Sequence, residues 1–290
     1  MNDLKETKVI DKLPNKGINW GVKAINAPKV WEHTKGEGIK VVVVDSGVDM
    51  NHPDLKDKIK GTINVYNKST RLVTDNYGHG SHVAGLIVGE KTGVAPNAEL
   101  YVVNSLNNDG IGGAREVLDG VTYAININAD ILCMSLGINK KLPQIMESRL
   151  KKAYYQGTLI VCATGNNGVQ NVAYPASYDF VIGVGGINHK FERADFSNYG
   201  FDMDVVAPAV DILSTWKDGK YAYMSGTSTA SPLVAGGLAL VKSYYRKQGI
   251  ELNAKQIKEM ISKLNNEKDR YVGYGLFDVA KLIGLENENF

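Results

Sequence analysis

Short runs of apolar, mostly β-branched residues recur along the chain and alternate with segments of helical spacing. Five of the runs have the length of buried strands, at 39–45, 100–104, 131–136, 158–163 and 181–185. Four segments have the spacing of helices, at 114–127, 143–156, 228–245 and 253–264. Continuous apolar runs suit a parallel sheet that is covered on both faces. The pattern therefore predicts an α/β fold, with a doubly wound, mainly parallel β-sheet flanked by helices.

The composition fits one large globular domain. The chain has 290 residues, of which 43% are apolar and 22% charged, enough for a sizeable core. Its 31 glycines are spread through a mixed sequence without a repeat, and they indicate many tight turns. Cys133 and Cys162 each lie inside an apolar run, so we expect two buried thiols rather than a disulfide.

The charge pattern argues against several classes of partner. The 33 basic and 31 acidic residues are scattered and give a formal charge of +2, so no basic surface for nucleic acid stands out. No apolar run is long enough to span a membrane. Residues 1–8 lack the apolar segment of a secretory signal, so we expect a cytoplasmic protein.

Polar groups follow three of the predicted strands. Asp45 ends the first run, Ser135, Leu136 and Gly137 come at the end of another, and Gly165 with Asn166 follows the run 158–163. The carboxyl ends of parallel strands meet at one edge of such a sheet, where ligands bind. We therefore expect these groups to lie close together.

An acid, a base and a nucleophile occur in the order Asp45, His79, Ser228. A serine hydroxyl needs a base to accept its proton, and the base needs a partner that orients it. Ser228 follows a Gly-Thr pair at the start of a small-residue helix, where N–H groups point at developing negative charge. Read separately, Ser228 could instead cap its helix, and Asp45 could cap a turn.

Two further interpretations concern neighbouring polar residues. His79 and His82 are three apart and could be metal ligands together with Asp45, but no further ligand has a suitable spacing, so we expect no metal and a structural role for His82. Asn166 could donate its amide N–H to the oxyanion of a tetrahedral intermediate. Its alternative is an Asn-Gly turn in the stretch 165–168.

With these residues, the chain resembles the subtilisin-family serine proteases, the subtilases. The matching stretches lie at 44–49, 52–55, 78–85, 93–96, 134–137, 165–166, 206–208, 226–228 and 273–278. The Asp, His, Ser order is that of subtilisin. The resemblance implies a serine endopeptidase, with an N-terminal extension at 1–17 and a catalytic domain at 18–290.

The resemblance also implies how a substrate binds. An extended peptide would pair with Gly110, Ile111 and Gly112 on one side and with the segment 135–137 on the other. The pocket for the residue before the scissile bond would have walls at 135–137 and at Ala163 to Gly165, with Ala173 near its floor. No acid lies among these residues, so an uncharged side chain is expected there. Without the family, the stretch 110–115 could suggest a phosphate loop, but it lacks the dinucleotide spacing.

The chain departs from secreted subtilases in two places. Only the seven residues 86–92 occupy the position of a calcium-binding loop, although Asp54 matches a calcium ligand. We therefore expect no required cofactor, and at most a weaker cation site at carbonyls near Ala176 and Tyr178. The segment before the catalytic domain is too short for a folding propeptide, and its residues 9–14 would either block the cleft or fray.

These features predict an Asp-His-Ser serine endopeptidase that acts, as a cytoplasmic monomer, on a peptide or protein substrate in extended form. The interpretation that we favour on sequence alone is removal of the leader from a modified precursor peptide, as in lantibiotic maturation. General intracellular protein turnover is the alternative within the enzyme class. A catalytically silent subtilase scaffold that binds peptides is the alternative from another class.

Overall fold

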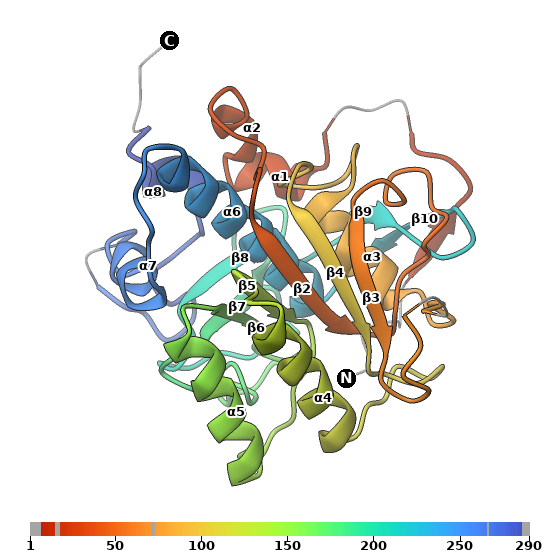
Figure 1. Cartoon of the computed structure of the whole chain (residues 1–290). Coiled ribbons are helices and arrows are strands. Elements are labelled where there is room, and N and C mark those ends of the chain that lie inside the picture. The colour runs from red at the N-terminus through yellow and green to blue at the C-terminus, as the bar shows by residue number, and fades with distance from the viewer. Residues whose placement is uncertain (1–6, 15–17, 71–72, 266, 286–290) are drawn as a thin grey trace.

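A seven-stranded parallel sheet forms the centre of the molecule (Figure 1). The computed structural model describes residues 7–14, 18–70, 73–265 and 267–285. The strand order is β3-β4-β2-β5-β6-β7-β8. The strands are β2 (Lys40–Asp45), β3 (Ile59–Asn64), β4 (Glu99–Asn104), β5 (Ile131–Met134), β6 (Leu159–Ala163), β7 (Ile182–Ile187) and β8 (Val205–Pro208).

The five strands expected from the apolar runs are confirmed to within two residues at each end. The structure adds β3 and β8, the two edge strands, which the sequence pattern did not predict. β3 is mostly half-buried and has no continuous apolar run, and β8 has only four residues. The half-buried positions of β3 leave a weaker apolar pattern in the sequence, whereas β8 is buried but short and ends at a proline.

Helices cover both faces of this sheet (Figure 1). On one face, α3 (His79–Val88) and α6 (Thr227–Lys247) pack against each other and against the strands. On the other face lie α4 (Ala114–Asn126) and α5 (Gln144–Tyr155). Each face has its own large apolar core. The predicted α/β fold is therefore confirmed, and the predicted helices at 114–127, 143–156 and 228–245 are α4, α5 and α6.

Smaller elements surround these layers. They are α1 (Trp20–Ala24), α2 (Ala27–Val30), α7 (Ala254–Ile261), which is the predicted helix 253–264, and α8 (Val279–Leu282). A second, antiparallel sheet has the order β1-β10-β9, formed by Lys8–Ile10, Tyr221–Met224 and Ile212–Thr215. Lys8 lies opposite Tyr223, and Ile10 opposite Tyr221. The N-terminal segment, expected to block the cleft or fray, thus pairs with β10 along Lys8–Ile10; residues 1–6 and 15–17 lie outside the described residues.

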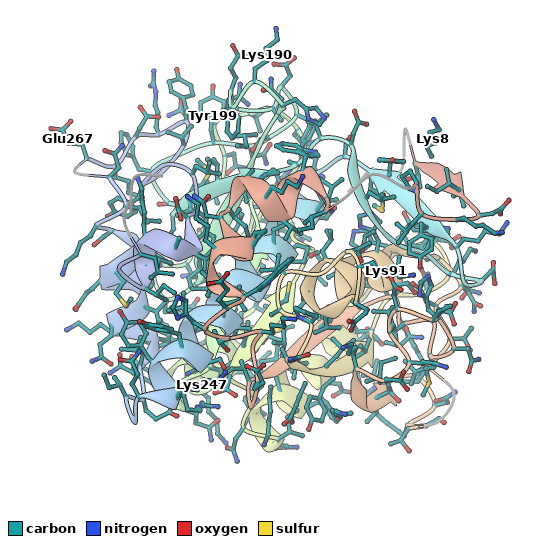
Figure 2. All side chains as sticks on the ribbon, turned by 90° about the horizontal axis from the view of Figure 1, so that it is seen from above. Lys8, Lys91, Lys190, Tyr199, Lys247 and Glu267 are labelled. Carbon is teal, nitrogen blue, oxygen red and sulfur yellow. The ribbon has the colours of Figure 1, made fainter. Side chains whose placement is uncertain are left out.

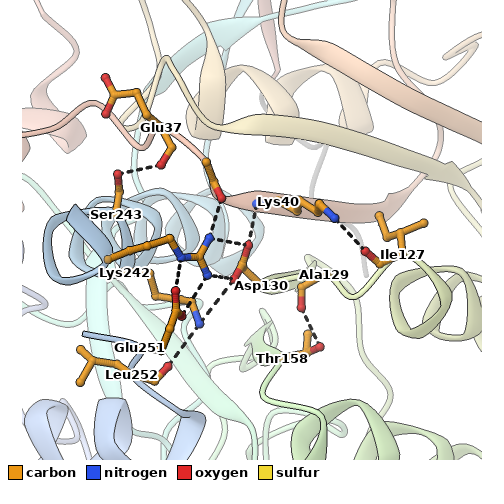
Figure 3. A network of polar contacts seen from close by, with 12 residues as sticks. Glu37, Lys40, Ile127, Ala129, Asp130, Thr158, Lys242, Ser243, Glu251 and Leu252 are labelled. Atoms are coloured by element: carbon orange, nitrogen blue, oxygen red, sulfur yellow. Dashed lines mark hydrogen bonds and ion pairs between the residues drawn. The ribbon is translucent and has the colours of Figure 1, made fainter. Parts of the chain in front are cut away.

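A polar network joins strands and helix at the amino end of the sheet (Figure 3). The carboxylate of Asp130, directly before β5, accepts a hydrogen bond of 2.9 Å from the Lys40 N–H at the start of β2. It also pairs with Arg246 at 2.6 Å and with Lys242 at 3.5 Å, both on α6. One carboxylate therefore ties two strands to the helix that crosses them.

The outer surface carries mixed charge. Figure 2 shows Lys190 and Glu267 extending outward at the edge of the molecule, while Lys247 pairs with Glu37 at 3.0 Å. None of the helices in the described part of the chain is both long and apolar enough to cross a membrane.

Both cysteines are buried free thiols, as predicted. Burial raises the pKa of Cys133 to about 12, so this sulfur is held as the neutral thiol.

Candidate active site

The carboxyl end of β2 presents a buried carboxylate to a histidine. Asp45 is the last residue of β2, and His79 is the first residue of α3. The His79 Nδ1 atom lies 2.8 Å from Oδ1 and 3.0 Å from Oδ2 of Asp45. Because a carboxylate can only accept, Nδ1 carries the proton, and Nε2 is the ring nitrogen that can act as a base.

A glycine allows this contact. A Cβ added at Gly80 would lie 2.2 Å from the carbonyl oxygen of Gly47, so only glycine lets the first turn of α3 approach the loop after Asp45 this closely. The glycine at position 80, within the matching stretch 78–85, is therefore a packing requirement at the site.

Ser228 lies at the N-terminus of α6. It is the second residue of the helix after the N-cap Gly226, and it is fully buried. Its Oγ has no hydrogen-bond partner among the described residues. The first N–H groups of a helix have no acceptor within it, and the helix dipole adds positive potential there. The environment of Ser228 thus favours negative charge.

Thr227, the residue directly before Ser228, holds the side chain of Asn166. The Asn166 side-chain oxygen accepts 2.8 Å hydrogen bonds from both the N–H and the hydroxyl of Thr227. The Gly165 N–H donates to the same hydroxyl at 3.2 Å. These bonds fix the amide so that its NH₂ group faces away from Thr227. Sequence reasoning missed Thr227, and the only signal was its place directly before the candidate nucleophile.

Backbone hydrogen bonds bring the three predicted pocket segments together. Ile138 and Tyr174 exchange N–H to carbonyl bonds of 2.9 Å in both directions, and the Ala173 N–H donates to the Thr164 carbonyl at 2.9 Å. Gly165 has φ +103°, and a Cβ there would lie 2.5 Å from the amide nitrogen of Asn198. Residues 163–165 therefore adjoin Ala173, and Ile138, directly after the segment 135–137, adjoins Tyr174.

A cavity of about 350 Å³ opens beside His79. Its walls include all of 110–112 and 135–137, so the structure brings these two predicted segments to one site, but Ala163, Gly165 and Ala173 are not part of its lining. Sequence reasoning missed the floor, which α4 and α5 supply through Val117, Met146 and Leu150. In the sequence, the only signal for these three residues is the apolar spacing of the two helices. Apart from His79, the lining has no ionisable side chain other than tyrosine.

His82 does not face the candidate site. Its Nε2 lies 3.0 Å from the Ile212 carbonyl and 3.1 Å from the Ala222 carbonyl, so it joins α3 to β9 and β10. Burial, and to a lesser degree the charge of His79, lowers the pKa of His82 to about 3. No three His, Cys, Asp or Glu side chains within the described ranges are grouped as metal ligands.

The segment 86–92 lies where the resemblance implies a calcium-binding loop beside Asp54. Calcium takes six to eight oxygen ligands at about 2.4 Å. Here the segment 86–92 completes α3 and closes in a tight turn, in which the Gly93 N–H donates to the Gly89 carbonyl at 2.8 Å. Asp54 faces Tyr221 instead: burial, and then the charge and hydrogen bond of Asp54, raise the pKa of Tyr221 to about 12.

A lysine lies close to the segment of Ala176 and Tyr178, where the weaker cation site is expected. The Lys258 ammonium donates to the carbonyls of Asp179 and Val181 at 2.7 and 2.6 Å, and it lies 3.1 Å from the carboxylate of Asp204. These carbonyls belong to the turn that follows Ala176 and Tyr178. The ammonium occupies the position between these two carbonyls and the Asp204 carboxylate, and it would repel a cation bound close to it.

A parallel α/β sheet with an Asp–His hydrogen bond and a serine at a helix N-terminus is the framework of a serine hydrolase. Residues 36–275 match the family model described as the subtilase family, Peptidase S8, so the chain belongs to that family and is a subtilisin-like serine endopeptidase. The intracellular serine protease of Paenibacillus polymyxa is 41% identical over 252 residues, which cover 82% of this chain and 76% of the relative.

Two other relatives span a similar part of the chain. The major intracellular serine protease of Bacillus subtilis (strain 168) is 41% identical over 250 residues, covering 81% of this chain and 76% of the relative. Subtilisin DY of Bacillus licheniformis is 37% identical over 274 residues, covering 90% of this chain and 97% of the relative.

Proposed function

We propose that Ser228 is the nucleophile of this protease, with His79 as its general base and Asp45 as the group that orients His79. Ser228 Oγ attacks the peptide carbonyl while His79 Nε2 accepts its proton, and the carbonyl becomes a tetrahedral oxyanion. His79 then donates the proton to the leaving amine, and an acyl-enzyme forms. Water, activated by the same histidine, hydrolyses the acyl-enzyme.

The observation that carries this proposal is the 2.8 Å hydrogen bond between Asp45 and His79. It fixes the tautomer in which Nε2 is a base, and the negative carboxylate stabilises the imidazolium that forms during the reaction. Asn166 and the Ser228 N–H are the proposed donors to the oxyanion. The Thr227 bonds to the Asn166 oxygen support this role, because they leave the amide NH₂ as the donor that can face the reacting carbonyl.

Labelling with a fluorophosphonate tests the assignment. This reagent reacts with an activated serine, so we expect one adduct, located on Ser228 by peptide mass mapping. Ser228→Ala should not be labelled, and His79→Ala should be labelled far more slowly. A native protein that stays unlabelled and hydrolyses no peptide would favour the peptide-binding scaffold.

The proposed substrate is an extended peptide that lies between 110–112 and 135–137. The apolar lining of the adjacent cavity supports a preference for uncharged side chains, because a charged group would lose water there without gaining an ion pair. A peptide library should give cleavage mainly next to uncharged residues. Strict cleavage after Arg or Lys would contradict this preference.

For the cellular role we propose general protein turnover in the cytoplasm. Two relatives at 41% identity are named as intracellular serine proteases, which supports this role. Leader removal from a lanthipeptide precursor is the second candidate; the short segment 86–92 and the neutral pocket favour it. The two roles differ in substrate range: a turnover protease degrades unfolded casein at many sites, whereas a leader peptidase cuts a modified precursor once and leaves casein largely intact.

A further inference from the structure

A buried carboxylate lies between the two segments that carry Asp45 and His79. Asp75 precedes α3, is 3% exposed and accepts five hydrogen bonds. No lysine, arginine or histidine pairs with it among the described residues, so hydrogen bonds alone compensate this buried charge. Retaining a carboxylate under such conditions is costly unless each acceptor position is filled, as it is here.

Each donor to Asp75 lies within two residues of Asp45 or His79 in the chain. Oδ1 accepts from the Ser46 hydroxyl at 2.8 Å and from the Gly78 N–H at 2.7 Å. Oδ2 accepts from the N–H and the hydroxyl of Ser81 at 2.8 and 2.7 Å. Ser46 follows Asp45, while Gly78 and Ser81 enclose His79 in the chain. One carboxylate therefore connects the end of β2 to the first turn of α3.

Ser46 completes the connection. Its hydroxyl donates to Asp75 and accepts from the Gly80 N–H at 3.0 Å. Its own N–H donates to Asp45 Oδ1 at 2.7 Å, the oxygen that also contacts His79. The chain of bonds thus runs from Asp75 through Ser46 to the carboxylate that orients the histidine.

Asp75 also replaces the missing helix cap. The N-cap of α3 is Gly78, which has no side chain to accept from the first N–H groups of the helix. Asp75 Oδ2 accepts from the Ser81 N–H, the third of these groups, and places negative charge at the positive end of the helix dipole. The position of His79, the first residue of the helix, depends on this turn.

We propose that Asp75 is a positioning residue of the protease, which holds Asp45 and His79 at reacting distance through Ser46 and the first turn of α3. The inference rests on the proposed roles of Asp45 and His79. Misplacing a reacting group by about 1 Å can lower the rate by about 100-fold. Asp75→Asn keeps the shape of the side chain but removes one acceptor, and it sets an NH₂ group against a donor.

The test measures kcat and KM of Asp75→Asn, Ser46→Ala and the double variant with an uncharged peptide substrate. We expect kcat of Asp75→Asn to fall by about 10- to 100-fold while KM changes less than about twofold. The double variant should be no worse than the poorer single variant, because both substitutions break the same connection. Asp204→Asn, which removes another carboxylate that is 3% exposed but lies away from His79, should keep its kcat at a temperature where it remains folded.

Other outcomes are equally decisive. A folded Asp75→Asn with kcat within twofold of the native value, or losses that multiply in the double variant, would overturn the inference. If Asp75→Asn does not fold, Ser46→Ala decides: an unchanged kcat overturns the inference, and a loss of several-fold at constant KM supports it. Ser228→Ala and His79→Ala in the same assay separate the two proposals, since their full activity would instead refute the proposed function.

Discussion

At the scale of single residues, the candidate nucleophile, base and oxyanion donor should respond differently to substitution. Ser228→Ala or His79→Ala should lower kcat by about 10⁶-fold, as measured in a subtilisin, because the groups act as a unit. Asn166→Ala should lower kcat by about 100- to 1,000-fold, also a value measured in a subtilisin, since one oxyanion donor remains. Steady-state kinetics with a peptide substrate measures both. Equal losses in all three variants would contradict the role of Asn166.

His82 should make stability depend on pH. Its pKa is about 3 in the folded protein and 6.5 for the free side chain. Between these values the unfolded chain binds a proton that the folded chain does not, so the free energy of unfolding falls as the pH falls from about 6.5 to 3. Protonation would also place an N–H at the buried Nδ1, which has no hydrogen-bond partner among the described residues.

Urea unfolding between pH 4 and 7 measures this effect, in a Ser228→Ala background that prevents autolysis. His82→Gln keeps a donor for the carbonyls but cannot titrate. The slope of unfolding free energy against pH should be shallower in this variant, by up to about 1.4 kcal/mol per pH unit. His33→Gln, at an exposed position, is the matched control and should keep the native slope. Identical slopes in all three proteins would show that His82 does not carry the dependence.

At the scale of elements, burial decides how much of the fold the sequence predicts. The strand 40–45 is buried on both faces and has an unmistakable apolar run, as do the other central strands. β3, with its half-buried polar positions, has no such run, and β9 and β10 have only four residues each. Their pairing depends on residues far away in the chain, such as Lys8 opposite Tyr223. Single-sequence periodicity contains no such information.

The sequence likewise predicts some residues of the candidate site and not others. The topological rule for parallel sheets was sufficient to place Asp45, the segment 135–137 and Asn166 at one edge. It could not identify Thr227 or Asp75, whose roles depend on hydrogen bonds between segments that the fold brings together. An aspartate in a loop before a helix reads as a capping or turn residue until its five donors are known.

Lys258 should stabilise the turn after Tyr178, because its ammonium donates to two carbonyls there. Its ammonium fills a site made of two carbonyls and the Asp204 carboxylate. Lys258→Met should lower the free energy of unfolding by about 2 kcal/mol, because charged hydrogen bonds are lost and the carboxylate is left with the more distant Lys268, at 3.7 Å. The emptied site then resembles a cation site.

Added K⁺ or Ca²⁺ should therefore raise the melting temperature of Lys258→Met more than that of the native protein. Choline chloride at equal ionic strength is the salt control. Lys255→Met, which removes a lysine whose side chain is 79% exposed on the same helix, is the variant control and should not gain ion dependence. If Lys258→Met responds to K⁺, Ca²⁺ and choline alike, the lysine does not stand in for a cation.

At the scale of the whole molecule, the two ends of the sheet have different tasks. The carboxyl end carries Asp45, Ser135 and Asn166, and the loops there leave a cavity. The amino end carries Asp130, which joins β2, β5 and α6 through Lys40, Arg246 and Lys242 (Figure 3). Because Ser228 lies in the first turn of α6 and the helix reaches this network near its other end, its anchorage at one end of the sheet supports the site at the opposite end.

Asp130→Asn should consequently change stability without changing the chemistry. The side chains of Asp130 and Lys242 are 13% and 5% exposed, so the substitution leaves the buried ammonium of Lys242 without the negative charge of Asp130, while the Leu252 carbonyl at 3.2 Å still accepts from it. We expect a loss of about 3 kcal/mol in the free energy of unfolding, measured in the Ser228→Ala background. In the active protein, kcat should stay within twofold of the native value at temperatures below the melting transition.

Asp119→Asn, which breaks the exposed pair with Lys68, is the control and should lower the free energy of unfolding by less than about 1 kcal/mol. A fall in kcat of folded Asp130→Asn would instead mean that the start of α6 moves when its far end is released.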